Sequence, residues 1–447
     1  MSLKIQKMQG RARATTLTLH HGPVRTPVFM PVGTQGTVKG LTASQLKQLD
    51  CEIILGNTYH LALRPGADIL DELGGLHKLA GWDRNILTDS GGFQMVSLLA
   101  LADITEEGVT FQSPVDGTTM LLTPEESMRV QNCIGSDIMM VLDDVVSSVS
   151  TDMERFKEAT ARTIRWLDRC IKAHKKKDTQ CLFAITQGGL DVTPNGLRDQ
   201  CLDMMLKRDK DLPGYAIGGL AGGESKDAFW KVVAHGTKRL PSNKPRYLMG
   251  VGYPLDLVVC TSLGVDMYDC VYPTRTARFG TALVPEETGL LKLKQSLCAN
   301  DHRPIEANCP CEACQNYTRA RIHYMLKSSN SIATRLITMH NISYMMRLVR
   351  TMRSEIINGT FDKFVDKFLK HFFKSKTSYP KWVCEALTEA GLGEVVKDFL
   401  PKDNNNEKND DNNGNVKNMK RNNTNNNANN GEQKKTTKKR KKIVEKM

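Results

Sequence analysis

The chain contains eight short apolar runs, and each of them ends in a polar residue, a charged residue or a glycine. The runs cover residues 24–32, 52–57, 85–89, 137–143, 181–187, 214–219, 246–250 and 265–270. Amphipathic or glycine-bounded segments separate them, and residues 153–175 and 226–240 show the spacing of connecting helices. Continuous apolar strands that alternate with helices are typical of a parallel sheet covered on both faces. Eight such units predict an α/β fold, a (β/α)8 TIM-type barrel, ahead of an open doubly wound sheet.

The C-terminal ends of the predicted strands carry amides, glycines and three aspartates. These residues are Asn57, Asp89, Asp143, Gln187, Gly218, Gly219, Gly250 and Asp269. Active sites of such barrels lie at this end of the strands. Many ordinary strands end in a polar residue, so a polar residue at any single one of these positions does not by itself indicate an active site. Three aspartates at corresponding ends, each beside a glycine or a turn, favour one site at the mouth of the barrel.

The last apolar run delivers Asp269 to a strand end. Pro273 follows and is expected to stop the strand, because proline has no N–H for a ladder hydrogen bond. Arg275 and Arg278 come next. A carboxylate beside fixed cations suits the holding and attack of an anionic substrate, whereas the plain alternative for the arginines is a solvated turn.

Two glycine-containing segments follow other predicted strands. In the first, Asp89-Ser-Gly-Gly-Phe-Gln, the aspartate can accept a proton, the glycines allow close backbone approach and Phe93 can stack on a heterocycle. The second, residues 216–224, offers bare backbone groups but lacks the Gly-Lys-Ser/Thr ending of a phosphate-binding loop. The alternatives are an Asp-Ser turn and a flexible glycine loop.

Three cysteines lie within six residues of a polar segment, and a histidine follows on a predicted helix at 331–357. The set is Cys309, Cys311, Cys314 and His340. Three thiolates and one imidazole complete a tetrahedral zinc shell without an open position, which predicts a structural site. The alternative is three buried thiols and a surface histidine. His20 and His21 are expected to be an exposed pair without a spacing partner for a metal.

Charge and composition divide the chain. Of the formal net charge of +13, residues 401–447 carry +7, with thirteen basic and six acidic side chains, so the rest carries +6. That mildly basic remainder permits a nucleic-acid partner without establishing one. We expect the barrel at residues 1–300 and a helical zinc-binding subdomain at 301–393. The Asn- and Lys-rich residues 394–447 lack the apolar content to fold and are expected to form a disordered tail.

No apolar run approaches the roughly 20 residues of a transmembrane helix. The first residues lack the apolar core of a signal peptide. Twelve cysteines in such a chain imply a reducing compartment, in which some of them should be metal ligands.

These motifs together resemble the tRNA-guanine transglycosylase family. The similarity covers about residues 8–393 and rests on segments 89–94, 187–189, 218–220 and 269–275 and on the Cys/Cys/Cys/His set. Within the family the chain looks like the eukaryotic, queuine-inserting catalytic subunit. It lacks the C-terminal RNA-binding extension that marks archaeal members. The resemblance implies exchange of guanine for queuine at the wobble position of tRNAs with GUN anticodons, those for Asp, Asn, His and Tyr.

The resemblance assigns the chemistry to two aspartates. Asp269 would attack the ribose C1′ of the wobble guanosine, expel guanine and form a covalent ribosyl–enzyme intermediate, by the logic of a retaining glycosidase. Asp89 would be the general acid/base that takes a proton from the incoming base.

The base-binding positions follow from the same resemblance. Asp143 would accept the N1–H and 2-amino group of a guanine-like edge, and Gln187 and the Gly219 N–H would meet its O6. Phe93 and Met249 would sandwich the ring. The remaining implied positions are Ser90, Gly91, Gly92 and Leu220.

The implied RNA contacts fall in two segments. Arg275 and Arg278 would hold the uridines that flank the wobble base. The full implied set is Gly250, Val251, Gly252, Tyr253, Pro254, Leu255, Asp256, Thr274, Arg275, Thr276, Ala277 and Arg278. The target base must leave its stack to reach a pocket, so the substrate is an anticodon loop rather than a duplex.

One departure from bacterial members concerns substrate size. Those members carry bulkier or more polar residues where this chain has Val145 and Gly222. Gly222 removes side-chain volume beside the pocket, which would leave room for the cyclopentenediol of queuine.

The resemblance also implies one structural zinc ion, a heterodimer with a related non-catalytic accessory subunit, and a cytoplasmic location that includes the mitochondrial outer membrane surface. Two alternatives stay open at this point. The chain could itself be the accessory subunit, which should lack some of Asp89, Asp143 and Asp269. It could also be a zinc-bearing barrel hydrolase of small glycosides, which has no need of Arg275 and Arg278.

Overall fold

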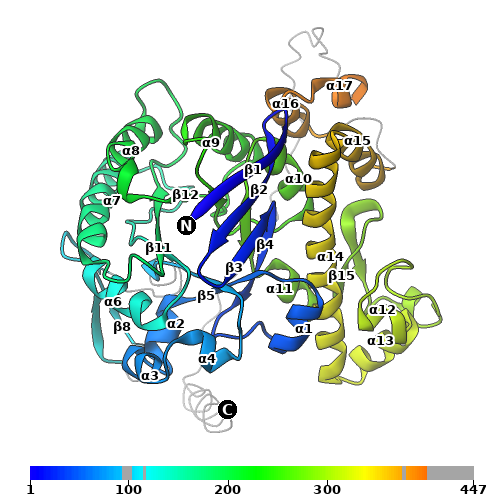
Figure 1. Ribbon diagram of the computed structural model, residues 1–447. Helices are drawn as coiled ribbons and strands as arrows, with labels where there is room; N and C mark the ends of the chain where they lie inside the picture. Colours follow the sequence, from blue (N-terminus) through cyan, green and yellow to red (C-terminus); the bar gives the residue numbers. More distant parts are fainter. Residues whose placement is uncertain (93–102, 114–116, 375–378, 400–447) are drawn as a thin grey trace, which may run out of the picture. The chain divides into compact units, whose positions relative to one another are not determined.

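The computed structural model describes residues 1–92, 103–113, 117–374 and 379–399. Its centre is the predicted closed barrel of eight parallel strands, in the order β10-β11-β12-β13-β14-β4-β5-β6 (Figure 1). These strands are β4 (Val28–Gly33), β5 (Ile53–Gly56), β6 (Asn85–Thr88), β10 (Ile138–Met140), β11 (Cys181–Thr186), β12 (Gly214–Ile217), β13 (Arg246–Leu248) and β14 (Met267–Cys270). Each pairs in parallel with the next barrel strand along the chain, and β14 closes onto β4. The barrel prediction is confirmed.

The barrel strands are buried on both faces. Every residue of β4, β5, β6, β10, β12 and β13 is buried. One face fills the barrel interior and the other packs under helices, which is why these strands read as continuous apolar runs rather than as an alternating pattern.

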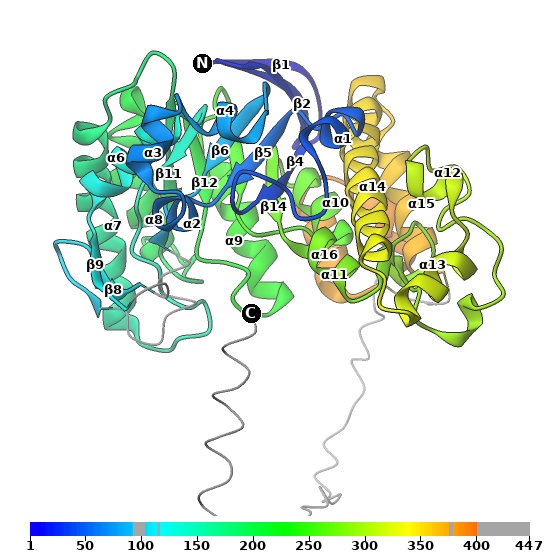
Figure 2. The ribbon, with the colours of Figure 1, turned by 90° about the horizontal axis from the view of Figure 1, so that it is seen from below.

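Helices surround the barrel, and several of them begin at side-chain caps that the sequence supplies. Thr123, Asp152 and Ser225 each accept the backbone N–H three residues further on, which satisfies a free donor of the first helical turn. Figure 2 shows the ring of helices outside the strands. They are α1 (Ala43–Gln48), α2 (Thr58–Leu63), α3 (Ala67–Glu72), α4 (Leu76–Ala80), α6 (Pro124–Ile134), α7 (Met153–Ala173), α8 (Leu197–Leu206), α9 (Lys226–Arg239), α10 (Pro254–Ser262) and α11 (Tyr272–Arg278). The two predicted connecting helices correspond to α7 and α9.

Three antiparallel sheets accompany the barrel. They contain β1 (Ser2–Gln9), β2 (Ala12–Leu19) and β3 (Gly22–Thr26); β7 (Asp103–Ile104), β8 (Val109–Gln112) and β9 (Thr119–Leu122); and β15 (Thr281–Leu283) with β16 (Leu290–Lys292). The predicted first run, 24–32, was wrong as one strand, because β3 and β4 belong to different sheets. Pro27 separates them and has no N–H for a ladder.

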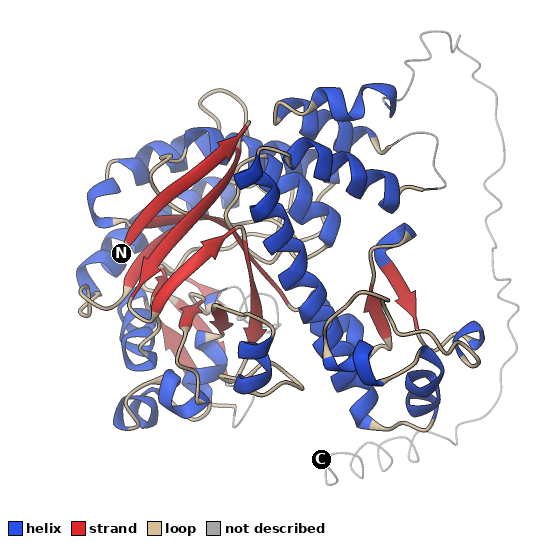
Figure 3. Ribbon diagram, turned by 45° about the vertical axis from the view of Figure 1, so that its right-hand side comes forward, coloured by secondary structure: helices blue, strands red, loops and turns tan. Residues whose placement is uncertain are grey.

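One long helix connects the barrel with the C-terminal region. This helix, α14 (Ser331–Asn358), begins at the Asn330 cap and packs against both α11 and β15. Figure 3 shows it between the barrel strands and the small C-terminal sheet. The other helices here are α12 (Glu312–Asn316), α13 (Arg319–Lys327), α15 (Phe361–Phe372), α16 (Lys381–Glu389) and α17 (Gly393–Val396).

All described residues belong to one compact unit, Met1–Pro401. The predicted boundaries at 300 and 393 stay predictions, although Val396, in the stretch assigned to the tail, is buried in α17. Residues 400–447, which hold most of the predicted disordered tail, lie outside the described residues. Within the described part of the chain, no helix combines the length and apolarity that a membrane span needs.

Candidate active site

Asp269 sits on β14 with one carboxylate oxygen held in place. Its Oδ1 accepts hydrogen bonds from Tyr247 Oη at 2.5 Å and from the backbone N–H of Gly250 at 2.8 Å. Among the described residues, no hydrogen bond reaches Oδ2. Burial raises the pKa of Asp269 to about 6 against these two bonds, and the nearby charge of Asp89 adds to the rise. One oxygen is therefore oriented while the other is available to attack.

Asp89 follows β6 directly and is buried. Asn57 Nδ2 donates to its Oδ2 at 2.5 Å, and the backbone N–H of Thr58 donates to its Oδ1 at 2.9 Å. Both partners come from the end of the neighbouring strand β5 and the start of α2. Because Asp89 also acts on the pKa of Asp269, the two carboxylates share one site.

Asp143 follows β10 and is surrounded by neutral donors. Gln187 Nε2 donates to its Oδ2 at 2.6 Å, and Ser90 Oγ donates to its Oδ1 at 3.2 Å. Burial raises the pKa of Asp143 to about 6, although both bonds favour the charged form. No ion pair reaches Asp143 or Asp269 among the described residues, so both carboxylates keep their bonding capacity for a ligand.

The glycine segments lie at the same mouth. Gly91 and Gly219 have positive φ, +85° and +68°, which L side chains rarely adopt. A Cβ on Gly219 would lie 2.5 Å from Gln187 Oε1, so the backbone passes directly over that amide. Leu220 is buried, and Met249 is partly exposed just after β13. Phe93, the predicted stacking residue, lies outside the described residues.

A buried arginine supports this edge of the barrel. Arg198 on α8 donates to the carbonyl oxygens of Gly189, Thr186 and Gly218 at 2.8, 3.1 and 2.8 Å. Burial lowers its pKa to about 10. The guanidinium therefore joins the loops after β11 and β12, which carry Gln187 and Gly219.

The loop after β12 is closed by Glu224. It accepts the N–H groups of Ala221 and Gly222 at 2.8 and 3.0 Å, and the hydroxyl of Ser148 at 2.7 Å. A Cβ at Gly222 would lie 2.5 Å from Ser148 Oγ. Gly222 therefore permits close packing of this loop on the loop after β10.

The predicted RNA-binding segments are only partly exposed. Arg275 and Arg278 are exposed on α11, and no ion pair involves either within the described part of the chain. Gly250 is exposed, Tyr253 and Thr276 are half-buried, and the other predicted positions are buried: Val251, Gly252, Pro254, Leu255, Asp256, Thr274 and Ala277. We expected Pro273 to end the strand, but β14 already ends at Cys270. Pro273 lies instead in the first turn of α11, where a backbone N–H has no partner within the helix and its loss costs no hydrogen bond.

The Cys309, Cys311, Cys314 and His340 side chains meet in a buried cluster. The Sγ atoms of the three cysteines lie, in chain order, 3.6, 3.8 and 3.3 Å from His340 Nδ1. His340 Nε2 lies 2.7 Å from the Leu283 carbonyl, which makes Nε2 the N–H donor and leaves Nδ1 as a ligand. The set could hold one metal ion. Next to it on α14, Asn341 donates to the Pro273 and Thr281 carbonyls at 2.9 and 3.1 Å, which ties the cluster to α11.

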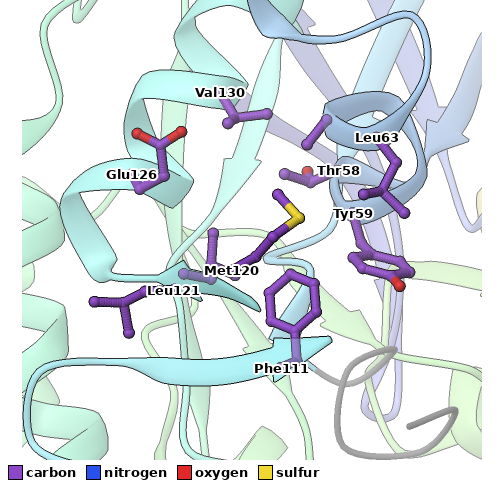
Figure 4. Close-up of a pocket in the computed structure, with 10 residues that line it drawn as sticks. Thr58, Tyr59, Leu63, Phe111, Met120, Leu121, Glu126 and Val130 are labelled. Atoms are coloured by element: carbon purple, nitrogen blue, oxygen red, sulfur yellow. The ribbon is translucent and has the colours of Figure 1, made fainter. Parts of the chain in front are cut away.

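An apolar pocket of about 130 Å³ lies beside the acids without containing them. Figure 4 shows Thr58, Tyr59 and Leu63 from α2 facing Phe111 and Met120 from β8 and β9, with Glu126 and Val130 from α6. Thr58 is the only residue that it shares with the aspartate partners described above. The pocket has few polar groups, so the chemistry belongs to the mouth of the barrel.

Sequence reasoning missed Tyr247, Thr58 and Arg198. Tyr247 and Arg198 lie in ordinary strand and helix positions, and only their partners across the barrel reveal their roles. The expectation that His21 has no partner for a metal site was wrong, because its side chain meets those of His77 and Asp137 in space.

Comparison with known proteins places the chain in a family. The family profile described as "Queuine tRNA-ribosyltransferase" matches residues 8–374. The Schizosaccharomyces pombe queuine tRNA-ribosyltransferase catalytic subunit is 53% identical over 84% of this chain and 93% of its own length. The catalytic subunit from Caenorhabditis elegans is 48% identical, over 86% and 96%. A queuine tRNA-ribosyltransferase from Thermus thermophilus is 45% identical, over 87% and 98%. The chain belongs to the queuine tRNA-ribosyltransferase family.

Proposed function

We propose that this chain is a tRNA-guanine transglycosylase, a pentosyltransferase, that exchanges the wobble guanine of tRNAs with GUN anticodons for queuine. The observation that carries the proposal is the meeting of Asp269, Asp89 and Asp143 at one mouth of the barrel. Each has its own hydrogen-bond partners, and Asp269 has one oxygen available. The names of the relatives support the same activity.

The reaction consists of two displacements at the ribose C1′. Asp269 Oδ2 attacks C1′, the bond from C1′ to guanine N9 breaks, and guanine leaves with the bonding electrons and takes up a proton from the protonated Asp89 carboxyl. Asp89 then removes a proton from the ring nitrogen of the incoming base, which attacks C1′ and releases the Asp269 carboxylate. Two inversions retain the configuration, as in a retaining glycosidase. The Tyr247 and Gly250 bonds orient Oδ1 so that Oδ2 faces the sugar.

Base selection is assigned to Asp143. An ionised carboxylate has about four acceptor sites, so Asp143 can keep its Ser90 and Gln187 bonds and still accept two N–H groups of a guanine edge. Adenine offers no matching pair of donors, and it would leave the buried carboxylate unsatisfied. Such a mismatch gives strong discrimination.

The anticodon loop is assigned to the rim formed by α11. Arg275 and Arg278 are exposed cations one helical turn apart on the same short helix that follows Asp269. Their position suits the phosphates and bases next to a flipped nucleotide. The buried neighbours Thr274 and Ala277 position the helix instead of contacting RNA.

The metal of the Cys309, Cys311, Cys314 and His340 cluster is assigned as zinc, because three thiolates and one imidazole without an open position are typical of structural zinc. The ion supplies a cross-link between the segment around Cys309–Cys314 and α14. Asn341 transmits this rigidity to α11, so the cluster acts on RNA binding and stability rather than on the bond-breaking steps.

Queuine is proposed as the incoming base on the basis of size. The resemblance assigns small side chains to positions 145 and 222 beside the base site, whereas in the structure a Cβ at Gly222 would meet Ser148. The proposal extends to a heterodimer with a related accessory subunit and to a cytoplasmic location that includes the mitochondrial outer surface, both of which rest on the family resemblance alone.

The test is to incubate the protein with an anticodon stem-loop RNA and guanine and to run a denaturing gel. A covalent RNA–protein band that disappears in Asp269→Ala is expected. Labelled-guanine exchange, with and without the accessory subunit, then measures turnover with queuine and with the smaller aminomethyl precursor base. No band with the wild-type protein would contradict the mechanism, and a preference for the precursor would contradict the size argument alone.

A further inference from the structure

A second cluster of metal-ligating side chains lies at the opposite end of the barrel. Asp137 directly precedes β10, His77 is on α4, and His21 lies in the turn between β2 and β3. One ligand atom from each lies within 4.8 Å of those of the other two. The N-terminal strand ends meet here, whereas the catalytic aspartates lie at the C-terminal ends, so the cluster is separate from the active site.

Asp137 supplies a fixed, fully buried carboxylate. Its Oδ1 accepts the backbone N–H and the Nδ1 of His21 at 3.0 and 2.8 Å, and its Oδ2 accepts the N–H of Ile86 at 2.8 Å. The carboxylate therefore cannot turn away, and any ligand that it binds is held at a defined position. A preorganised anion of this kind is what a cation site needs.

His77 supplies the unexplained part of the cluster. Its Nε2 is buried and lies 3.3 Å from Asp137 Oδ2, at an ion-pair distance but without the geometry of a good hydrogen bond. A cation held between this nitrogen and the carboxylate would give both groups a better partner. The ring of His77 lies 3.7 Å from that of His21, at an angle of 17°.

We propose that His21, His77 and Asp137 bind one divalent transition-metal ion, of the class of Zn²⁺, Co²⁺ or Ni²⁺. Two imidazoles and one carboxylate are a ligand set that such ions accept. The His21 side chain is 31% exposed, so solvent reaches the site and water completes the coordination. The ion would join the β2–β3 turn to α4 and to the start of β10.

Binding requires one ring to turn. A good metal–imidazole bond lies in the plane of the imidazole ring. Two stacked, nearly parallel rings have separate planes, so one ion cannot lie in both. His21 is the ring that turns, because it lies in a turn and is more exposed than His77, whose side chain is 12% exposed. Its turning breaks the Nδ1 contact with Asp137, while the backbone N–H of His21 still holds that carboxylate.

The experiment titrates Co²⁺ into the full-length protein whose cysteine cluster already holds Zn²⁺. Calorimetry, visible absorption and thermal unfolding are measured together. We expect one additional Co²⁺ per chain, weak ligand-field bands without a thiolate charge-transfer band, and a higher Tm. Release of Zn²⁺ with a thiolate band and no additional equivalent would overturn the proposal.

Variants separate the site from surface binding. His77→Phe keeps an aromatic ring against His21 but has no ligand atom, and His21→Ala removes the other imidazole. Each should bind Co²⁺ at least about tenfold more weakly and lose the Co²⁺-dependent rise in Tm. His20→Ala, which removes the exposed neighbouring imidazole, should bind like the wild type. Equal binding by His77→Phe, or equal weakening by His20→Ala, would overturn the proposal.

Discussion

The two ends of the barrel treat buried carboxylates in opposite ways. At the N-terminal end, Asp266 forms a fully buried ion pair with Arg13, in which Nε and a terminal nitrogen donate at 2.8 and 2.5 Å. At the C-terminal end, Asp143 and Asp269 have only neutral donors, and burial raises the pKa of each to about 6. Removing one partner of a compensated pair leaves a buried charge unpaired, whereas an uncompensated carboxylate stores free energy that a ligand can release.

The largest expected effect is on activity at the C-terminal end. Asp269→Asn removes the proposed nucleophile and should lower base exchange by at least about 10⁴-fold. The thermal midpoint should stay equal or rise, because a neutral amide is less costly to bury than a carboxylate. Exchange kinetics and calorimetric melting of the same preparation check both parts. A large loss of stability in this variant would contradict the contrast between the two ends.

The converse substitution at the N-terminal end should affect stability. Asp266→Asn leaves the buried Arg13 guanidinium without its charge partner, and the free energy of unfolding should fall by roughly 3–5 kcal/mol. The rate per folded molecule should be unchanged. Chemical denaturation measures the loss, and Asp227→Asn, which breaks an exposed pair with Lys231, should cost much less because solvent screens that pair. Equal losses in the two variants would count against the importance of burial.

A smaller effect is expected from the residue that orients Asp269. Tyr247→Phe removes a hydrogen bond to the charged carboxylate, worth about 1.5–3 kcal/mol, so kcat should fall by roughly 10- to 100-fold. This bond lowers the pKa of Asp269, and its loss should move the acidic limb of the pH–rate profile upward. A purely structural role of Tyr247 would leave that limb in place. Tyr215→Phe, which loses a bond to Asp209 instead, is the matched control.

The smallest expected effect is the change in exchange rate for each pH unit. The pKa of Asp269 is raised from 3.8 to about 6, so below about pH 6 the ionised nucleophile, and with it the exchange rate, should fall about tenfold per pH unit. The raised pKa of Asp269 and Asp143 means that the folded state binds more protons, so these groups destabilise the fold as pH rises from about 4 to 6.

Asp137, at the N-terminal end of the barrel, should show the opposite dependence of stability on pH. Burial alone would raise its pKa, but His77, Ile86 and His21 hold it below the ordinary value. Its contribution to stability is present above pH 3.8 and is lost as pH falls through the lowered pKa. Activity should therefore disappear on acidification before the fold does, which parallel rate and circular dichroism measurements check. Simultaneous loss of both would contradict the assignment.

The sequence predicted the elements better than their contacts. Apolar runs, the three terminal aspartates and the clustered cysteines are local patterns, and each was found at its expected place. The errors arose where neighbours in sequence part in space: Pro27 separates β3 from β4, Pro273 lies in the first turn of α11, and His21 turns toward His77.

The amino-acid sequence by itself determined most of the barrel strands, the end of the barrel that carries the acids, and the four residues of the Cys/Cys/Cys/His cluster, because strand burial and residue spacing depend largely on residues close along the chain. Only the tertiary structure decided that Tyr247 orients Asp269, that Asn57 holds Asp89, and that Arg198 joins the loops after β11 and β12. Those contacts arise from closure of the barrel and its strand register, which bring residues of different strands together and which no local pattern records.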